Sequence, residues 1–316
     1  MIKPASSESF QRRKCHRRSR SFRANPIDPS TICLRRRFAL MATVSRKIIS
    51  ASTIWISAIA AFLLFANSVV GFTKPQKKSA ASGQEMPPAL LLAGAPFVTD
   101  DPEPPAPGGW EINVPFILER TPGTTDMNAP LFDLNYGLPG IQLKLAVPVK
   151  IVHEDSSGTV AGIGDMLIGV KWRFFNSKKS QLQLAISPQL LVPSGDHARG
   201  LGEGRTAFVL PLAAQKTWDK WTLYGNVGFW WRTAAETHNY FYASAVLERE
   251  INERLTLGAE LFGNPPTEPG GHSDVAFNVG GSWKLRQHVN VLFTGGRGIV
   301  GNKTAIAYIG LQFLTK

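Results

Sequence analysis

The chain has 316 residues, with 35 Lys and Arg against 23 Asp and Glu and a formal net charge of +12. The excess charge is confined to the N-terminus. Residues 1–68 carry 13 basic residues against Glu8 and Asp28, a net charge of +11, so the remaining 248 residues carry 22 basic against 21 acidic residues, a net charge of +1. A nearly neutral body excludes the basic surface that nucleic-acid binding needs. Cys15 and Cys33 also lie in the first stretch, which excludes disulfides and cysteine-ligated metal sites from the rest.

The first apolar segment of the chain is typical of export. Residues 48–72 contain no charge and follow Arg46 and Lys47, as in a secretory signal peptide or a transmembrane anchor. Ala66 and Ser68 supply the small residues of a cleavage site. We therefore predict a signal peptide over 41–68, with an uncleaved anchor as the alternative.

Residues 1–40 form a basic extension that is longer than an ordinary signal-peptide n-region. Met41 offers a better start, so we interpret the extension as a gene start placed too far upstream. The alternative is a twin-arginine signal, because Arg35, Arg36 and Phe38 match that pattern loosely.

Residues 69–108 are rich in Pro, Ala, Gly and Lys and show no helical period. This composition predicts a periplasmic linker. The alternative is that residues 99–107, which precede the first predicted strand, fold back into the barrel as a plug.

Residues 109–316 alternate between apolar and polar side chains with a period of two. In the first segment, Trp110, Ile112 and Val114 lie on one face and Glu111 and Asn113 on the other. The pattern predicts an all-β domain of twelve antiparallel strands, near 110–119, 131–138, 141–150, 165–174, 181–192, 205–215, 221–231, 240–250, 255–262, 274–285, 289–296 and 304–313.

The predicted connections alternate between long and short. Those after odd-numbered strands are long, as at 120–130 and 151–164, and those after even-numbered strands are short, as at 139–140. An even strand count with long loops at one end and tight turns at the other, behind a signal peptide, is typical of outer-membrane proteins. We therefore predict a single up-and-down transmembrane β-barrel. A soluble barrel or sandwich with its apolar face turned inward is the alternative.

Two further features favour a membrane barrel. Aromatic residues lie near predicted strand ends, where they fit interfacial girdles: Trp110, Trp172, Phe174, Trp218, Trp221, Trp231, Trp283 and Phe313. The last strand ends on Phe313, which resembles the C-terminal signal of outer-membrane barrels, although three residues follow it. We expect outer-membrane lipid and the barrel-assembly machinery as partners.

Several phrases of the sequence, in order, resemble the transporter family labelled "MetA-pathway of phenol degradation". They are APFVTDDP at 95–102, GWE at 109–111, DLNYG at 133–137, GIGD at 162–165, GVKWRF at 169–174, PSG at 193–195, RGLGEG at 199–204 and GGRG at 295–298. The resemblance spans 95–316. It implies a porin-like outer-membrane barrel that passes small compounds, aromatic ones among them.

The polar face of the predicted strands carries both signs of charge. We predict these residues to line the lumen: Glu111, Asn113, Asp133, Lys144, Asp165, Lys171, Arg173, Arg205, Glu248, Glu260 and Asp274. Charges in a confined space are expected to pair across strands, and the same charges would select among solutes. Barrels of about 8 strands are filled and those of 16–18 leave a channel, so twelve strands predict a narrow or partly plugged lumen.

Four histidines lie in different predicted loops and are candidates for a metal site at the loop end: His153, His197, His238 and His272. Otherwise we predict no metal and no cofactor.

The sequence as a whole predicts a channel or transporter for a small-molecule solute, exported to the outer membrane and not an enzyme. The alternatives are a structural or adhesive barrel, and a lipid hydrolase using Ser194 and His197 or Ser273 and His272. The sequence does not indicate the oligomeric state.

Overall fold

A computed structural model describes residues 94–233, 239–264, 273–301 and 303–316. The predicted basic extension, the signal peptide and the part of the linker before residue 94 lie outside the described residues, as do His238 and His272. Within the described ranges no helix has the length and apolar character to cross a membrane.

The described chain is almost entirely β-structure. Its strands are β1 (Trp110–Thr121), β2 (Thr124–Leu138), β3 (Ile141–Glu154), β4 (Gly158–Ile163), β5 (Met166–Ser177), β6 (Leu182–Ile186), β7 (Gln189–Val192), β8 (Ala207–Trp218), β9 (Trp221–Arg232), β10 (Tyr240–Asn252), β11 (Leu255–Asn264), β12 (Asp274–Arg286), β13 (Val289–Val300) and β14 (Ala305–Leu314). A short 3-10 helix, η2 (His197–Arg199), lies between β7 and β8.

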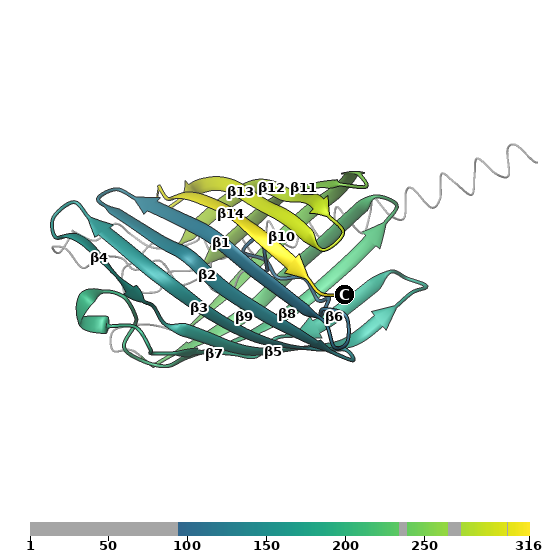
Figure 1. Cartoon of the computed structure of the whole chain (residues 1–316), viewed down its shortest axis with the longest axis horizontal. Coiled ribbons are helices and arrows are strands. Elements are labelled where there is room, and N and C mark those ends of the chain that lie inside the picture. Colours follow the sequence, from purple (N-terminus) through teal and green to yellow (C-terminus); the bar gives the residue numbers. More distant parts are fainter. Residues whose placement is uncertain (1–93, 234–238, 265–272, 302) are drawn as a thin grey trace, which may run out of the picture. The chain divides into compact units, whose positions relative to one another are not determined.

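The strands form one closed antiparallel barrel. Strands that follow one another in sequence pair, except β4 with β5 and β6 with β7, and β1 closes the ring by pairing with β14 from Glu111 with Leu314 to Arg120 with Ala305 (Figure 1). Two wall strands are split into pieces: β4 and β5 both pair with β3, and β6 and β7 both pair with β5 and β8. The wall therefore has twelve strands, which confirms the predicted fold.

Proline explains one of the two breaks. Pro188 separates β6 from β7 and has no N–H to contribute to the ladder. The wall stays hydrogen-bonded there, because the Val170 amide donates to the Pro188 carbonyl and the Ser187 amide to the Pro211 carbonyl, both at 3.0 Å.

Two of the predicted long loops are wrong. At 120–130 the hairpin of β1 and β2 continues to a turn at Gly123, and at 151–164 β3 pairs with β4 down to a turn at Gly158. Both glycines have positive φ, 88° and 89°, so the chain turns tightly there. The alternation is weak in these segments because strands that extend beyond the buried wall do not need an apolar face.

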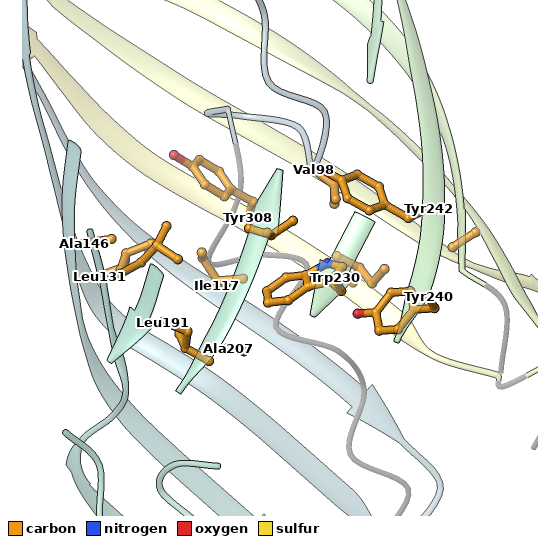
Figure 2. Packing of buried hydrophobic residues seen from close by; sticks show 14 of the residues in the cluster. Val98, Ile117, Leu131, Ala146, Leu191, Ala207, Trp230, Tyr240, Tyr242 and Tyr308 are labelled. Atoms are coloured by element: carbon orange, nitrogen blue, oxygen red, sulfur yellow. The ribbon is translucent and has the colours of Figure 1, made fainter. Parts of the chain in front are cut away.

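The two faces of the wall differ as the alternation predicts. Large apolar side chains on the outer face are exposed, for example Phe116 at 56%, Val279 at 54% and Ile309 at 59%. Their sequence neighbours face inward and are buried, including Ile117, Asn278 and Tyr308. Figure 2 shows the inward-facing apolar side chains, which come from strands all around the ring.

Candidate functional site in the barrel interior

Residues 94–105, which precede β1, occupy the middle of the barrel, and we refer to them as the strap. The strap bonds to polar side chains on four separate strands: Lys171 of β5, Asn226 of β9, Glu260 of β11 and Thr294 of β13. Because these strands lie on different sides of the ring, the strap is enclosed by the wall. The sequence left open a periplasmic linker or a plug for this segment, and the hydrogen bonds of its described part are made to inward-facing side chains of the wall.

Glu260 is the main anchor of the strap. It is 2% exposed and receives hydrogen bonds from the Val98 amide at 3.2 Å, the Thr99 amide at 2.6 Å and the Thr99 hydroxyl at 2.7 Å. Asn278 of β12 adds a fourth, donated by Nδ2 at 2.7 Å. A carboxylate can accept several hydrogen bonds and donates none, so this cluster of donors matches its chemistry.

The second anchor joins the strap to a buried lysine. Lys171 Nζ lies 2.8 Å from Asp100 Oδ1, and the two side chains are 4% and 14% exposed. Asn226 holds the same strap residue through its backbone, since its Oδ1 accepts from the Asp100 amide and its Nδ2 donates to the Asp100 carbonyl, both at 2.8 Å. Such a reciprocal amide pair fixes the strap backbone in one register.

Next to this pair the strap carries two more acids. Glu103 lies 3.6 Å from Arg173 and is largely exposed. Burial raises the pKa of Asp101 to about 7, although the charge of Lys171 opposes this rise and the neighbouring Asp100 adds to it. The strap is thus an acidic segment in which burial raises the pKa of one carboxyl group.

The strap also contributes apolar contacts. Phe97 is fully buried against Tyr224 and Val246, and a side chain at Gly258 would lie 3.0 Å from its ring. Val98 joins a larger interior cluster that includes Trp230, Tyr240, Tyr242 and Tyr308 (Figure 2). Trp230 and Tyr240 stack with their ring centroids 6.2 Å apart.

A separate polar network crosses β1, β2 and β3 inside the barrel. Asn113 donates to Glu111 and to Asp133, both at 3.0 Å, and Lys144 lies 3.2 Å from Asp133. Asn113, Asp133 and Lys144 are at most 7% exposed. The predicted pairing of opposite charges across neighbouring strands is present here.

Asp165 has a different role from the one expected. It is 5% exposed and accepts hydrogen bonds from the Gly195 amide at 2.9 Å and the Glu203 amide at 2.6 Å. It therefore fixes the loop between β7 and β8. An ion pair between Glu203 and Arg232, at 3.0 Å, joins the same loop to the end of β9.

The remaining predicted lumen residues lie nearer the two ends of the barrel. Arg205 is exposed before β8 and donates to the Thr233 carbonyl at 3.3 Å, so its prediction as a lumen residue is wrong, because the strand begins only at Ala207. Asp274 begins β12 and lies against Gly301, where no side chain would fit. Glu248 accepts from the Tyr224 hydroxyl at 3.3 Å.

Glu248 also lines a cavity at the barrel end where the short turns lie. The cavity has a volume of about 370 Å³ and a mixed polar lining that includes Thr222, Glu250, Thr256 and Lys284. It forms a hydrophilic vestibule at this end of the interior.

The metal and hydrolase candidates do not assemble in the described ranges. His153 contacts Thr159 at 2.8 Å and His197 contacts the Gly202 carbonyl at 3.1 Å, and in the described part of the chain no group of three or more metal-ligating residues converges. The Ser194 hydroxyl donates to the Gly164 carbonyl and accepts from the Met166 amide, both at 2.9 Å. Ser194 and His197 are therefore engaged with loop backbone.

Sequence reasoning missed several polar side chains of the site. Asn226, Asn278 and Thr294 are inward-facing and at most 7% exposed. The period-two pattern could have found Asn278, which lies between Phe277 and Val279, but Asn226 and Thr294 each have a glycine on one side, and none of the three carries a charge.

Comparison with known proteins places this geometry in a family. No curated protein matches the sequence. The fold is similar to the COG4313 outer membrane channel from Pseudomonas putida F1, with a TM-score of 0.58, 16% identity, and coverage of 68% of this chain and 98% of that one. The KdgM porin matches with a TM-score of 0.44, 10% identity and coverage of 64% of this chain and 98% of that one. The CymD monoaromatic hydrocarbon channel matches with a TM-score of 0.38, 7% identity and coverage of 66% of this chain and 88% of that one.

The family model described as "Putative MetA-pathway of phenol degradation" matches residues 99–307. This match begins inside the strap and covers the wall from β1 into β14. It extends over about two thirds of the 316 residues. The chain belongs to this family.

Proposed function

We propose that the protein is an outer-membrane channel that passes small molecules, aromatic compounds among them, along the interior that the strap occupies. One observation carries the proposal. The segment that fills the middle of the lumen belongs to no wall strand and is held there by side-chain contacts, so it can move without breaking the barrel ladder.

The wall supports this proposal chemically. Its outer face is apolar, as a lipid-facing barrel requires, and its interior carries paired charges and hydrogen-bonding groups. The vestibule lined by Glu248 and Lys284 gives a polar opening at one end. Export through the predicted signal peptide and insertion by the barrel-assembly machinery are part of the same proposal.

The interior cluster supports aromatic solutes in particular. Trp230, Tyr240, Tyr242 and Tyr308 present rings to the lumen, and the Tyr240 and Tyr308 hydroxyls have no hydrogen-bond partner among the described residues. A ring with a hydroxyl group suits such a surface, because burial of a hydroxyl is favourable only when it is hydrogen-bonded. The family's link to phenol degradation agrees with this chemistry.

Single-channel conductance in planar bilayers tests the proposal. We expect the full chain to give small or rare open steps, and a variant with a weakened strap, Thr99→Val with Asp100→Asn, to give larger or more frequent ones. Liposome swelling with phenol gives an independent measure of flux. If neither protein gave conductance steps in bilayers or phenol-dependent swelling of liposomes, the channel function would be refuted.

The same purified protein tests the alternatives. Release of fatty acids from phospholipid vesicles would favour a hydrolase, with Ser194→Ala as its matched control. The absence of conductance, solute flux and fatty-acid release would favour a structural or adhesive barrel.

A further inference from the structure

The four consecutive residues 97–100 of the strap present three different chemical groups, a ring, a hydroxyl and a carboxylate, to four residues of the wall. The Phe97 ring packs against Tyr224 and Val246, the Thr99 hydroxyl donates to Glu260, and the Asp100 carboxylate pairs with Lys171. Adjacent Cα atoms are about 3.8 Å apart, so the ring, the hydroxyl and the carboxylate come from a stretch of backbone at most about 11 Å long.

The wall groups on the other side of these contacts are deeply buried. Lys171 and Glu260 are 4% and 2% exposed, and both use the strap as a polar partner. A buried charge that loses its partner is destabilised strongly. The strap therefore leaves most readily when other groups of the same chemistry take its place.

The charge of the strap determines the sign of the charge of a solute that could replace it. Residues 94–109 contain Asp100, Asp101 and Glu103 and no basic residue. Departure of the strap removes these acids from the lumen and frees Lys171 and Arg173 on β5. The part of the open interior beside β5 would attract an anion, although Glu111 of β1 stays close to Lys171. Glu260 would instead need a hydrogen-bond donor in place of the strap.

We propose that the strap is a tethered internal ligand, and that the solute that displaces it is a hydroxylated aromatic carboxylate. The carboxylate of the solute takes the place of Asp100 on Lys171, its hydroxyl donates to Glu260 in place of Thr99, and its ring occupies the apolar site of Phe97 beside Tyr224. This inference rests on the proposed channel function and names the substrate class of that channel.

The three contacts make the selection specific. A neutral phenol has the ring and the hydroxyl but cannot pair with Lys171. Benzoate has the ring and the carboxylate but has no donor for Glu260, and acetate has only the carboxylate. We expect displacement to follow the number of strap groups that each compound reproduces.

A thiol on the strap reports displacement directly. Cys15 and Cys33 are the only cysteines in the sequence, so replacing both with serine leaves Val98→Cys as the sole thiol of the full chain. Val98 is 8% exposed, and a small neutral maleimide should label this position only when the strap leaves. We expect 4-hydroxybenzoate to raise the labelling rate about tenfold or more with saturation, benzoate and 4-hydroxybenzyl alcohol to act more weakly, and acetate to have no effect.

Two variants distinguish binding of the solute at Lys171 from a general effect of anions on the labelling rate. Lys171→Gln should label faster without solute and lose the response to 4-hydroxybenzoate. Arg205→Gln removes one positive charge at an exposed position outside the interior and should keep the full response. An equal response to all four compounds, or retention of the response by Lys171→Gln, would overturn the proposal.

Conductance distinguishes this proposal from the channel function on which it rests. If the wild-type or strap-weakened protein conducts but 4-hydroxybenzoate changes neither labelling nor conductance, the internal-ligand proposal fails and the channel stands. The Thr99→Val, Asp100→Asn protein, whose strap is already loosened, gives the second test. Failure of 4-hydroxybenzoate to block its conductance would also overturn the proposal.

Discussion

Thr99→Val isolates one contact that holds the strap in the lumen. The substitution keeps the shape of the side chain and the hydrogen bonds that the Val98 and Thr99 amides donate to Glu260. It removes only the 2.7 Å hydrogen bond from the Thr99 hydroxyl to Glu260. A hydrogen bond to a charged group contributes about 1.5–3 kcal/mol. The undocked population should therefore rise about 13- to 160-fold.

Thr294→Val provides the matched comparison. The Thr294 hydroxyl donates to the Pro96 carbonyl at 3.1 Å, so the same substitution removes a hydrogen bond to a neutral acceptor. That loss is about 0.5–1.5 kcal/mol, or about 2- to 13-fold in population. Thr159→Val, on the exposed hairpin of β3 and β4, should have no effect on the strap.

The labelling rate of the Val98→Cys reporter measures these populations when the strap opens and closes faster than it is labelled. The rates should rank Thr99→Val above Thr294→Val, and Thr294→Val above Thr159→Val. Equal rates for Thr99→Val and Thr159→Val would refute the role of Glu260 as the main anchor. Thermal unfolding in detergent, expected to change little, checks that the barrel itself is intact.

Three other results are expected. The pKa of Asp101 is about 7 in the docked strap against an ordinary value of 3.8. Docking is therefore most favourable below about pH 4 and weakens as the pH rises through 7, because the docked form must then lose a proton that it holds more tightly. The labelling rate of the Val98→Cys reporter, corrected for thiol ionisation, should rise over this range, and Asp101→Asn should abolish the rise. Asp165→Asn puts an amide donor against the loop amides, at a cost of about 1–3 kcal/mol, so trypsin should cut after Arg199 faster than in wild type; an unchanged rate would show that Asp165 does not hold the loop. Val279→Lys on the outer wall should lower the free energy of unfolding in lipid vesicles by about 2–4 kcal/mol, and no loss would contradict the outward placement of this residue.

The wall could be predicted from sequence because its information is local. The alternation that places Trp172 outside and Lys171 inside is visible in two adjacent residues, and the same rule gave the strand count. It failed at strand ends. Residues 124–128 pair with 150–154 beyond the buried wall, where both faces of a hairpin tolerate polar side chains and the pattern loses its contrast.

The strap could not be predicted in the same way. Its composition suits a tether as well as a plug, and its partners are remote: Asn226 is 126 residues from Asp100, and Glu260 is 161 residues from Thr99. No local pattern records such contacts. The Asp165 role was hidden for a related reason, because a carboxylate that binds loop amides looks in sequence like one that lines a lumen.

The closure of the ring between β1 and β14 also bears on the order of assembly. The strap joins the wall at this seam, where Lys316 Nζ donates to the Pro107 carbonyl at 3.1 Å and the Trp110 amide to the Thr315 hydroxyl at 2.8 Å. Contacts between such distant residues form slowly, and those of the strap require β5, β9, β11 and β13 to be in place. The strap can therefore dock only when the ring is complete. A barrel in which one of these strands is missing or paired in the wrong register would lose the contacts that hold the strap as well as the closed wall.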